Sequence, residues 1–182
     1  SSPVAKERLP PLEAAWINEA RARGITVLII SDACDDRNCV AVTCEASQAG
    51  VPCKSGRAFV ELRKRTTAKW FARVMDDTFV DVDALTWHLA VYDETKPYYV
   101  GDMATAYADQ EERFRFAWGG AGWALSEPAA DLTEQHLDFY FYLVETTGCP
   151  AQTCNANMSW PAHYDSGAVS YTHLTLPTTD CV

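Results

Sequence analysis

Residues 25–31 have the sequence Ile-Thr-Val-Leu-Ile-Ile-Ser, an uninterrupted apolar and β-branched run that is typical of a strand buried on both faces. In residues 12–23, apolar side chains recur at helical spacing, and Gly24 follows where a helix C-cap is expected. A helix that leads directly into a buried, parallel-type strand is the basic unit of α/β proteins. The sequence therefore predicts the α/β class with a mostly parallel central sheet.

A second strand is predicted at residues 69–74, Lys-Trp-Phe-Ala-Arg-Val. A helix is predicted to begin at Asp83, the expected N-cap, with Leu85, Leu89 and Tyr92 on its inner face. The other predicted elements are strands at residues 98–100 and 114–118 and helices at residues 56–64, 127–135 and 137–146.

Composition indicates one folded domain. The chain has 182 residues, of which 48% are hydrophobic and 12% aromatic, enough apolar surface for a core. The formal net charge of −10 argues against a nucleic-acid partner, because neutralising phosphates requires a basic face. No stretch approaches the roughly 20 apolar residues that span a bilayer. Because the chain opens abruptly at Ser1, we expect a signal or membrane anchor upstream of it.

The last residues have an unusual sequence. Residues 169–178, Val-Ser-Tyr-Thr-His-Leu-Thr-Leu-Pro-Thr, are similar to the translation of a transposase adapter used in DNA library preparation. Segments of this kind are excluded from fold reasoning. We therefore expect a partial, C-terminally truncated domain over residues 1–168 and a non-native tail over residues 169–182, in which His173 has no function. The alternative is an ordinary Thr-rich tail.

Six of the seven cysteines precede this tail, four of them in residues 33–55, a segment with little periodicity that we expect to be a loop. Local disulfides would stabilise such a loop in an oxidising compartment, with Cys44–Cys53 and Cys149–Cys154 as plausible pairs. The alternative is a zinc site, but the spacings lack paired C-x-x-C motifs. A glycosylation sequon at Asn157 agrees with the secretory pathway. Sequence alone leaves the pairing open.

Acidic residues follow both predicted strands. Asp32 follows the first strand, and Asp76 and Asp77 follow the second. Ligands of open α/β sheets bind beyond the carboxyl ends of the strands. Adjacent carboxylates suit a hard divalent cation, which could bridge to a nucleotide diphosphate and neutralise charge on the leaving group. The alternative for such a doublet is a solvated turn or a helix cap.

Residues 70–82, WFARVMDDTFVDV, are similar to the fringe-family pattern W-F-x-x-V-D-D-D-x-(Y/F)-V-x-V. Residues 99–101, Tyr-Val-Gly, and residues 116–123, FAWGGAGW, resemble that family's Y-V-G and R-F-A-x-G-G-A-G-F segments in the same order. Upstream, similarity to the opening helix, first strand and stapled loop is seen at Arg8-Leu9, Trp16, residues 29–32, Cys44 and residues 52–54. The resemblance thus extends from Arg8 to Trp123.

This resemblance implies a GT-A-type, Rossmann-like fold that binds a nucleotide sugar. It implies a metal-dependent, inverting glycosyltransferase that uses Mn2+ and transfers a hexose or N-acetylhexosamine from a UDP-sugar donor. The acceptor would be a glycan or glycoprotein, joined through a β-1,3 linkage. It also implies the Golgi or ER lumen, where the full-length protein would be a single-pass type II membrane protein.

The resemblance also assigns site residues. Asp77 would bind Mn2+, and Asp76 and Asp32 would contact the donor. Arg8 matches a donor-binding arginine, whose planar fork suits a diphosphate. Gly119 and Gly120 would let the backbone approach the substrate closely. For Trp123, stacking on a sugar and filling the core stay open as alternatives.

The chain departs from the family pattern at several positions. Met75 replaces the first Asp of the triplet, and Ala72 and Ala124 stand where the family commonly has cysteines. For the catalytic base that deprotonates the acceptor hydroxyl, the candidate is Asp165. His163 is expected to be a surface residue, so the family's last metal ligand has no counterpart. A fragment without its base would be inactive even where the intact protein is an enzyme.

Two other functions stay open. One is a non-catalytic module that binds a sugar nucleotide or a glycan. The other is a phosphatase of the haloacid-dehalogenase type, in which a strand ends in D-x-D-x-T. Asp81-Val82-Asp83 has the spacing of the two acids, but Ala84 and Leu85 follow, and the motif lies past the strand end.

Overall fold

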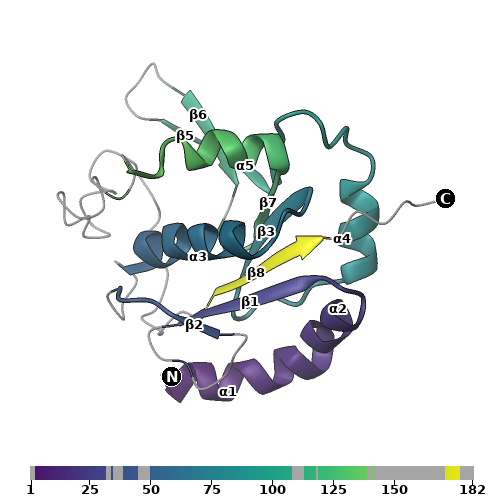
Figure 1. Cartoon of the computed structure of the whole chain (residues 1–182), viewed down its shortest axis with the longest axis vertical. Helices are drawn as coiled ribbons and strands as arrows, with labels where there is room; N and C mark the ends of the chain where they lie inside the picture. The colour runs from purple at the N-terminus through teal and green to yellow at the C-terminus, as the bar shows by residue number, and fades with distance from the viewer. Residues whose placement is uncertain are drawn as a thin grey trace.

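The structure is a computed structural model that describes residues 3–31, 34, 39–44, 50–107, 113–117, 119–138, 141 and 171–176. Figure 1 shows helices on both faces of a central sheet. The helical elements are α1 (Pro3–Leu12), the π-helix η1 (Glu13–Ile17), α2 (Asn18–Ala22), α3 (Val51–Arg65), α4 (Val82–Leu89) and α5 (Glu127–Glu134). The strands are β1 (Thr26–Ser31), β2 (Cys39–Ala41), β3 (Trp70–Met75), β4 (Tyr99–Gly101), β5 (Met103–Tyr107), β6 (Arg113–Ala117), β7 (Trp123–Ser126) and β8 (Tyr171–Leu176).

The described strands form a six-stranded sheet in the order β2-β1-β8-β3-β7-β4 and a separate β5–β6 pair. In the larger sheet, β1 and β2 pair in parallel, and the other four pairings are antiparallel. The prediction of the α/β class is confirmed, but parallel pairing does not predominate. The order of the strands in the sheet explains why most pairings are antiparallel. β1, β2, β3 and β4 share one direction, while β8 and β7 run the other way and separate β1 from β3 and β3 from β4.

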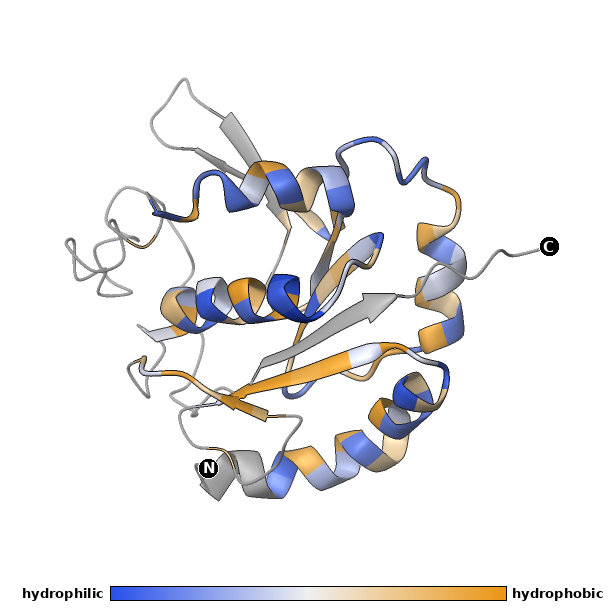
Figure 2. Cartoon of the chain, viewed as in Figure 1, coloured by the Kyte–Doolittle hydropathy of each residue, from blue (hydrophilic) through white to orange (hydrophobic). Residues whose placement is uncertain are grey.

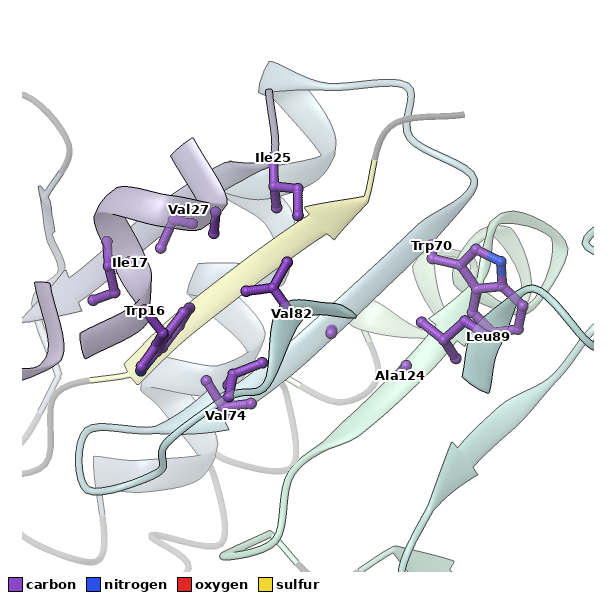
Figure 3. Close-up of a cluster of buried hydrophobic side chains, with 12 residues drawn as sticks. Trp16, Ile17, Ile25, Val27, Trp70, Val74, Val82, Leu89 and Ala124 are labelled. Carbon is purple, nitrogen blue, oxygen red and sulfur yellow. The ribbon is translucent and has the colours of Figure 1, made fainter. Parts of the chain in front are cut away.

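The predicted first helix and strand are confirmed, although the helix begins earlier. Residues 3–22 are helical through α1, η1 and α2, and Gly24 ends the run with a φ of +80°. Trp16 and Ile17 from this helix pack against Val27 of β1 and Val74 of β3 (Figure 3). This first core cluster fills one face of the sheet, and α4 adds Val82 and Leu89 to it.

A second core cluster fills the other face, under α3 and α5. From α3, Ala58, Phe59 and Leu62 are buried against Leu28 and Phe71 of β1 and β3. Figure 2 shows β1 apolar along most of its length, between helices whose polar and apolar residues alternate around the axis. Because both faces of β3 are covered, the polar loop after this strand is left at the edge of the sheet.

Two helix starts differ from the predictions. α3 begins at Val51 rather than at residue 56, with Pro52 in its first turn, where the missing N–H removes no helical hydrogen bond. α4 is capped by Asp81 rather than Asp83, since the Asp81 carboxylate accepts a hydrogen bond from Ala84 N at 2.9 Å. Asp83 instead pairs with Arg23, whose guanidinium lowers the pKa of the Asp83 carboxyl.

The four cysteines of the predicted loop are paired. Cys44–Cys53 is confirmed, and Cys34–Cys39 is a second disulfide. A zinc site formed by these four residues is thereby excluded, because each sulfur is already bonded. Cys149, Cys154 and the predicted helix at residues 137–146 lie wholly or mostly outside the described residues. Among the described helices, none has the length and apolarity needed to span a bilayer.

The segment expected to be a non-native tail contains β8. Residues 171–176 lie between β1 and β3 and pair antiparallel with both. β7 was not predicted, because the sequence WALS is short and follows a glycine-rich turn. In that turn Gly122 has a φ of +87°, and a Cβ there would lie 2.8 Å from the Arg73 carbonyl oxygen.

Ending the chain at residue 168 should lower the melting temperature while keeping a cooperative unfolding transition. β1 and β3 run in the same direction, so without β8 they can pair with each other in parallel, the somewhat weaker arrangement. Differential scanning calorimetry of the 1–168 and 1–182 chains checks this. Loss of any cooperative transition in the shorter chain would show instead that β8 is required for folding.

Gly122→Ala should destabilise the protein by about 3 kcal/mol, because it combines an unfavourable positive φ with a backbone clash. Gly24→Ala is the matched control, since Gly24 has a similar φ but a methyl group there would have no atom within 4 Å. The Gly24→Ala variant should lose only ~1 kcal/mol of unfolding free energy. Urea unfolding of both variants measures the difference, and equal losses would argue against a tight contact between the turn and β3.

Candidate functional site

The candidate site lies at the carboxyl edge of β1 and β3. Ile30 in β1 and Met75 in β3 are both level with Tyr171 of β8, so the two strands end side by side at this edge. The loop after β3 carries Asp76 and Asp77. Asp32, predicted to contact the donor, follows β1 directly but lies outside the described residues.

The two acids of the doublet have different environments. Asp76 is only 4% exposed, and its carboxylate accepts a hydrogen bond from Arg8 Nη1 at 3.1 Å. The Arg8 side chain is itself 41% exposed, so it bridges the buried acid and the surface. Asp77 is exposed, and within the described part of the chain no hydrogen bond or ion pair engages its carboxylate. Asp77 is therefore open to a ligand, whereas Asp76 is held.

Thr78 fixes the acidic loop at three points. Its backbone N–H donates to Met75 O at 3.2 Å and closes the turn. Its carbonyl oxygen accepts from Trp16 Nε1 at 3.2 Å, which attaches the loop to the first helix. Its hydroxyl donates to Gly120 O at 3.2 Å. Sequence reasoning missed this role, because a threonine after an acidic doublet gives no signal of its own.

The glycine turn after β6 lies beside the acidic loop. Gly120 O accepts a hydrogen bond from the Thr78 hydroxyl, and Gly119 O accepts one from Arg73 Nη1 at 3.1 Å. A Cβ at Gly119 would lie 3.2 Å from that nitrogen, so a side chain there would press on the guanidinium. The structure thus brings Arg8, Asp76, Asp77, Gly119 and Gly120 together at one edge.

Met75 lies on the opposite face of the sheet from the Arg8–Asp76 pair. Its Sδ accepts from Arg73 Nη2 at 3.1 Å, and its side chain packs against the second core cluster. Arg8 and Trp16, by contrast, come from the helix that covers the first cluster. The departure from the family pattern at Met75 therefore places a thioether on the α3 side, and the Arg8–Asp76 pair on the other face is present.

Trp123 is partly buried rather than presented on an open surface. It packs against the second core cluster and meets the Tyr99 ring edge to face, with the centroids 6.0 Å apart. Of the two alternatives for this residue, the contacts favour filling the core. The Asp81 and Asp83 spacing does not form a phosphatase site, since Asp81 caps α4 and Asp83 binds Arg23.

Asp165, the candidate base, and His163 lie outside the described residues. Among the residues that are described, no group of three or more His, Cys, Asp or Glu side chains is placed to hold a metal ion. A single open carboxylate still fits a divalent cation that is bound jointly with substrate phosphates, because such ions commonly take one or two protein carboxylates and complete their shell with phosphate oxygens and water. Asp77 is the described residue that offers this.

Comparisons with known proteins agree with this arrangement. Residues 3–157 match the sequence model of a family described as Fringe-like. The chain is also similar to the β-1,3-N-acetylglucosaminyltransferase lunatic fringe of Gallus gallus, with 32% identity over 146 residues. That match covers 69% of this chain and 39% of the relative, so the chain spans about two fifths of the relative's length. With the motifs in family order and the site residues gathered at one edge, the chain belongs to the fringe-like family.

Proposed function

We propose that the protein is the core of a metal-dependent, inverting glycosyltransferase with a GT-A-type fold. It transfers a hexose or N-acetylhexosamine from a UDP donor to a glycan or glycoprotein acceptor and forms a β-1,3 linkage. The observation that carries the proposal is the open carboxylate of Asp77 beside the Arg8–Asp76 pair and the glycine turn. The activity in the name of the Gallus gallus relative supports the reaction class.

In this proposal the chain's own residues hold the donor in place. Arg8 keeps part of its guanidinium exposed while one nitrogen binds Asp76, so its remaining donors are available to a diphosphate oxygen. The backbone at Gly119 and Gly120 forms the neighbouring wall, since glycine lets the chain approach a ligand closely. Asp32, which follows β1 in the sequence, is also proposed to contact the donor.

Asp77 is the residue proposed to hold Mn2+. When bound, the cation neutralises negative charge that develops on the departing UDP. The buried Asp76 contributes differently, since its ion pair with Arg8 fixes the arginine rather than the metal. The acceptor hydroxyl is deprotonated by a base further along the chain, for which Asp165 is the candidate.

The compartment proposed is the Golgi or ER lumen, with the intact protein anchored as a single-pass type II membrane protein. The two disulfides of the described chain support an oxidising compartment, because cytosolic thiols are normally kept reduced. They do not bear on the membrane anchor, which remains part of the proposal.

A second candidate function is a non-catalytic module that binds a UDP-sugar. Met75 favours it, because this side chain contributes a thioether to Arg73 where the family pattern has an acid. Binding and catalysis separate readily in experiment. Donor binding without transfer to an acceptor or hydrolysis of the donor, in the longest chain that can be produced, would select the module.

Asp77→Ala should abolish the part of UDP affinity that depends on Mn2+, because it removes the described carboxylate that is free to bind the ion. Calorimetric titration of UDP with and without Mn2+ measures this, and the dissociation constant with Mn2+ should rise about 10-fold or more.

Asp83→Ala is the matched control. It removes the same charge, but Asp83 binds Arg23, which lies fifteen residues along the first helix from Arg8 and so ~22 Å away. UDP affinity should be unchanged in this variant. An Asp77→Ala protein that keeps its Mn2+-dependent affinity would remove the basis of the proposed function.

A further inference from the structure

Lys54 is a buried cation that the proposed donor site does not yet include. The residue is 1% exposed and is among the largest fully buried side chains of the described chain. No hydrogen bond or ion pair to its ammonium group occurs among the described residues. Lysine is almost never fully buried without a partner, since an uncompensated charge in a protein interior is costly. The position therefore calls for an anion.

The direction of α3 places Lys54 at the same edge as the acidic loop. α3 leads through residues 66–69 into the start of β3, so the helix runs antiparallel to the strand and begins where the strand ends. Figure 1 shows the starts of α1 and α3 toward the same end of the strands. Lys54, Ala58 and Leu62 are four residues apart and all buried, which places Lys54 on the sheet-facing side of the helix.

The start of α3 is favourable for an anion in its own right. Helical side chains lean toward the N-terminus, so Lys54 in the first turns extends toward the edge of the sheet. The cap residue, Gly50, makes no side-chain hydrogen bond to the first turn. The positive end of a 15-residue helix dipole therefore points the same way as the lysine.

We propose that Lys54 and the first turn of α3 form an anion subsite that binds the diphosphate of the donor nucleotide. This inference rests on the proposed function and deepens it. Arg8 approaches the edge from the face of the first core cluster, and Lys54 approaches it from the face of the second. A diphosphate lying across the ends of β1 and β3 meets a cation from each face.

Lys54→Met tests this in the otherwise unchanged chain, because methionine keeps the length and packing of the side chain and removes its charge. The dissociation constant of UDP should rise ~10- to 100-fold, as expected for loss of a charged hydrogen bond. The affinity for uridine, which lacks phosphate, should change less than about 2-fold by the same reasoning. Melting temperature should stay the same or rise, since an apolar group replaces an uncompensated buried charge.

Lys64→Met is the matched control on the same helix, where the lysine is exposed and pairs with Glu61. It should leave UDP affinity unchanged. A Lys54→Met protein that binds UDP like the unaltered chain would overturn the proposal. Asp77→Ala tests the metal site separately. If Lys54→Met has no effect but UDP binding still depends on Mn2+, the anion subsite is wrong and the proposed function stands. If the unaltered chain binds no UDP at all, both the subsite and the proposed function are wrong.

A second measurement applies if Lys54→Met does not fold. Inorganic pyrophosphate without metal should raise the melting temperature of the unaltered chain. It should still do so in Arg8→Met, which lacks the cation of the opposite face but keeps Lys54. If pyrophosphate stabilises neither protein, or if Arg8→Met abolishes its entire effect, no second cation binds the diphosphate and the inference is wrong.

Discussion

The contact between Arg8 and the buried carboxylate of Asp76 determines how the rest of the site is arranged. A carboxylate that is 4% exposed requires a partner, and the partner here comes from a helix 68 residues earlier in the chain. This one pair fixes the start of the first helix against the end of β3. It also gives the two acids different roles, because the Asp76 carboxylate is bound within the protein and the Asp77 carboxylate remains available to a ligand.

Neutral contacts hold the same loop from two other directions. Trp16 binds the Thr78 carbonyl from the first helix, and Gly120 accepts the Thr78 hydroxyl from the turn before β7. Arg73 reaches that turn through Gly119. The first helix and the glycine turn, which are far apart in sequence, therefore both contact the loop at residues 75–78. A ligand at this edge meets a surface whose backbone is already ordered, which lowers the entropy lost on binding.

The sequence predicted those parts of the fold whose patterning is local. The β-branched run at residues 25–31 specifies a buried strand with little help from the rest of the chain. In the same way, Gly24 specifies the end of the helix before it. The helix start at Val51 was missed, because the preceding cysteine loop has no periodicity. The N-cap was placed at Asp83 because both Asp81 and Asp83 are good caps, and only the contact between Asp83 and Arg23 distinguishes them.

The sequence likewise indicated only some of the residues that meet at the candidate site. Residue types and motif order pointed to Arg8, Asp76, Asp77 and the glycine turn, since each has a distinctive chemistry, and their roles in binding stay predictions. The contacts of Thr78 and the burial of Lys54 were not predicted, because they depend on packing between distant segments rather than on neighbours in sequence. Sheet pairing was mispredicted for the same reason: β1 and β3 look like adjacent parallel strands, and nothing near either strand indicates that another lies between them.

The position of β8 has a consequence for how the chain reaches this state. During synthesis, β1 and β3 leave the ribosome well before β8, which begins 140 residues after the end of β1 and 96 residues after the end of β3. Pairings of such large sequence separation form slowly, because a long loop must close first. Until then the facing edges of β1 and β3 are unpaired or paired only with each other, and a nascent chain in this condition is a substrate for chaperones and for intermolecular strand pairing.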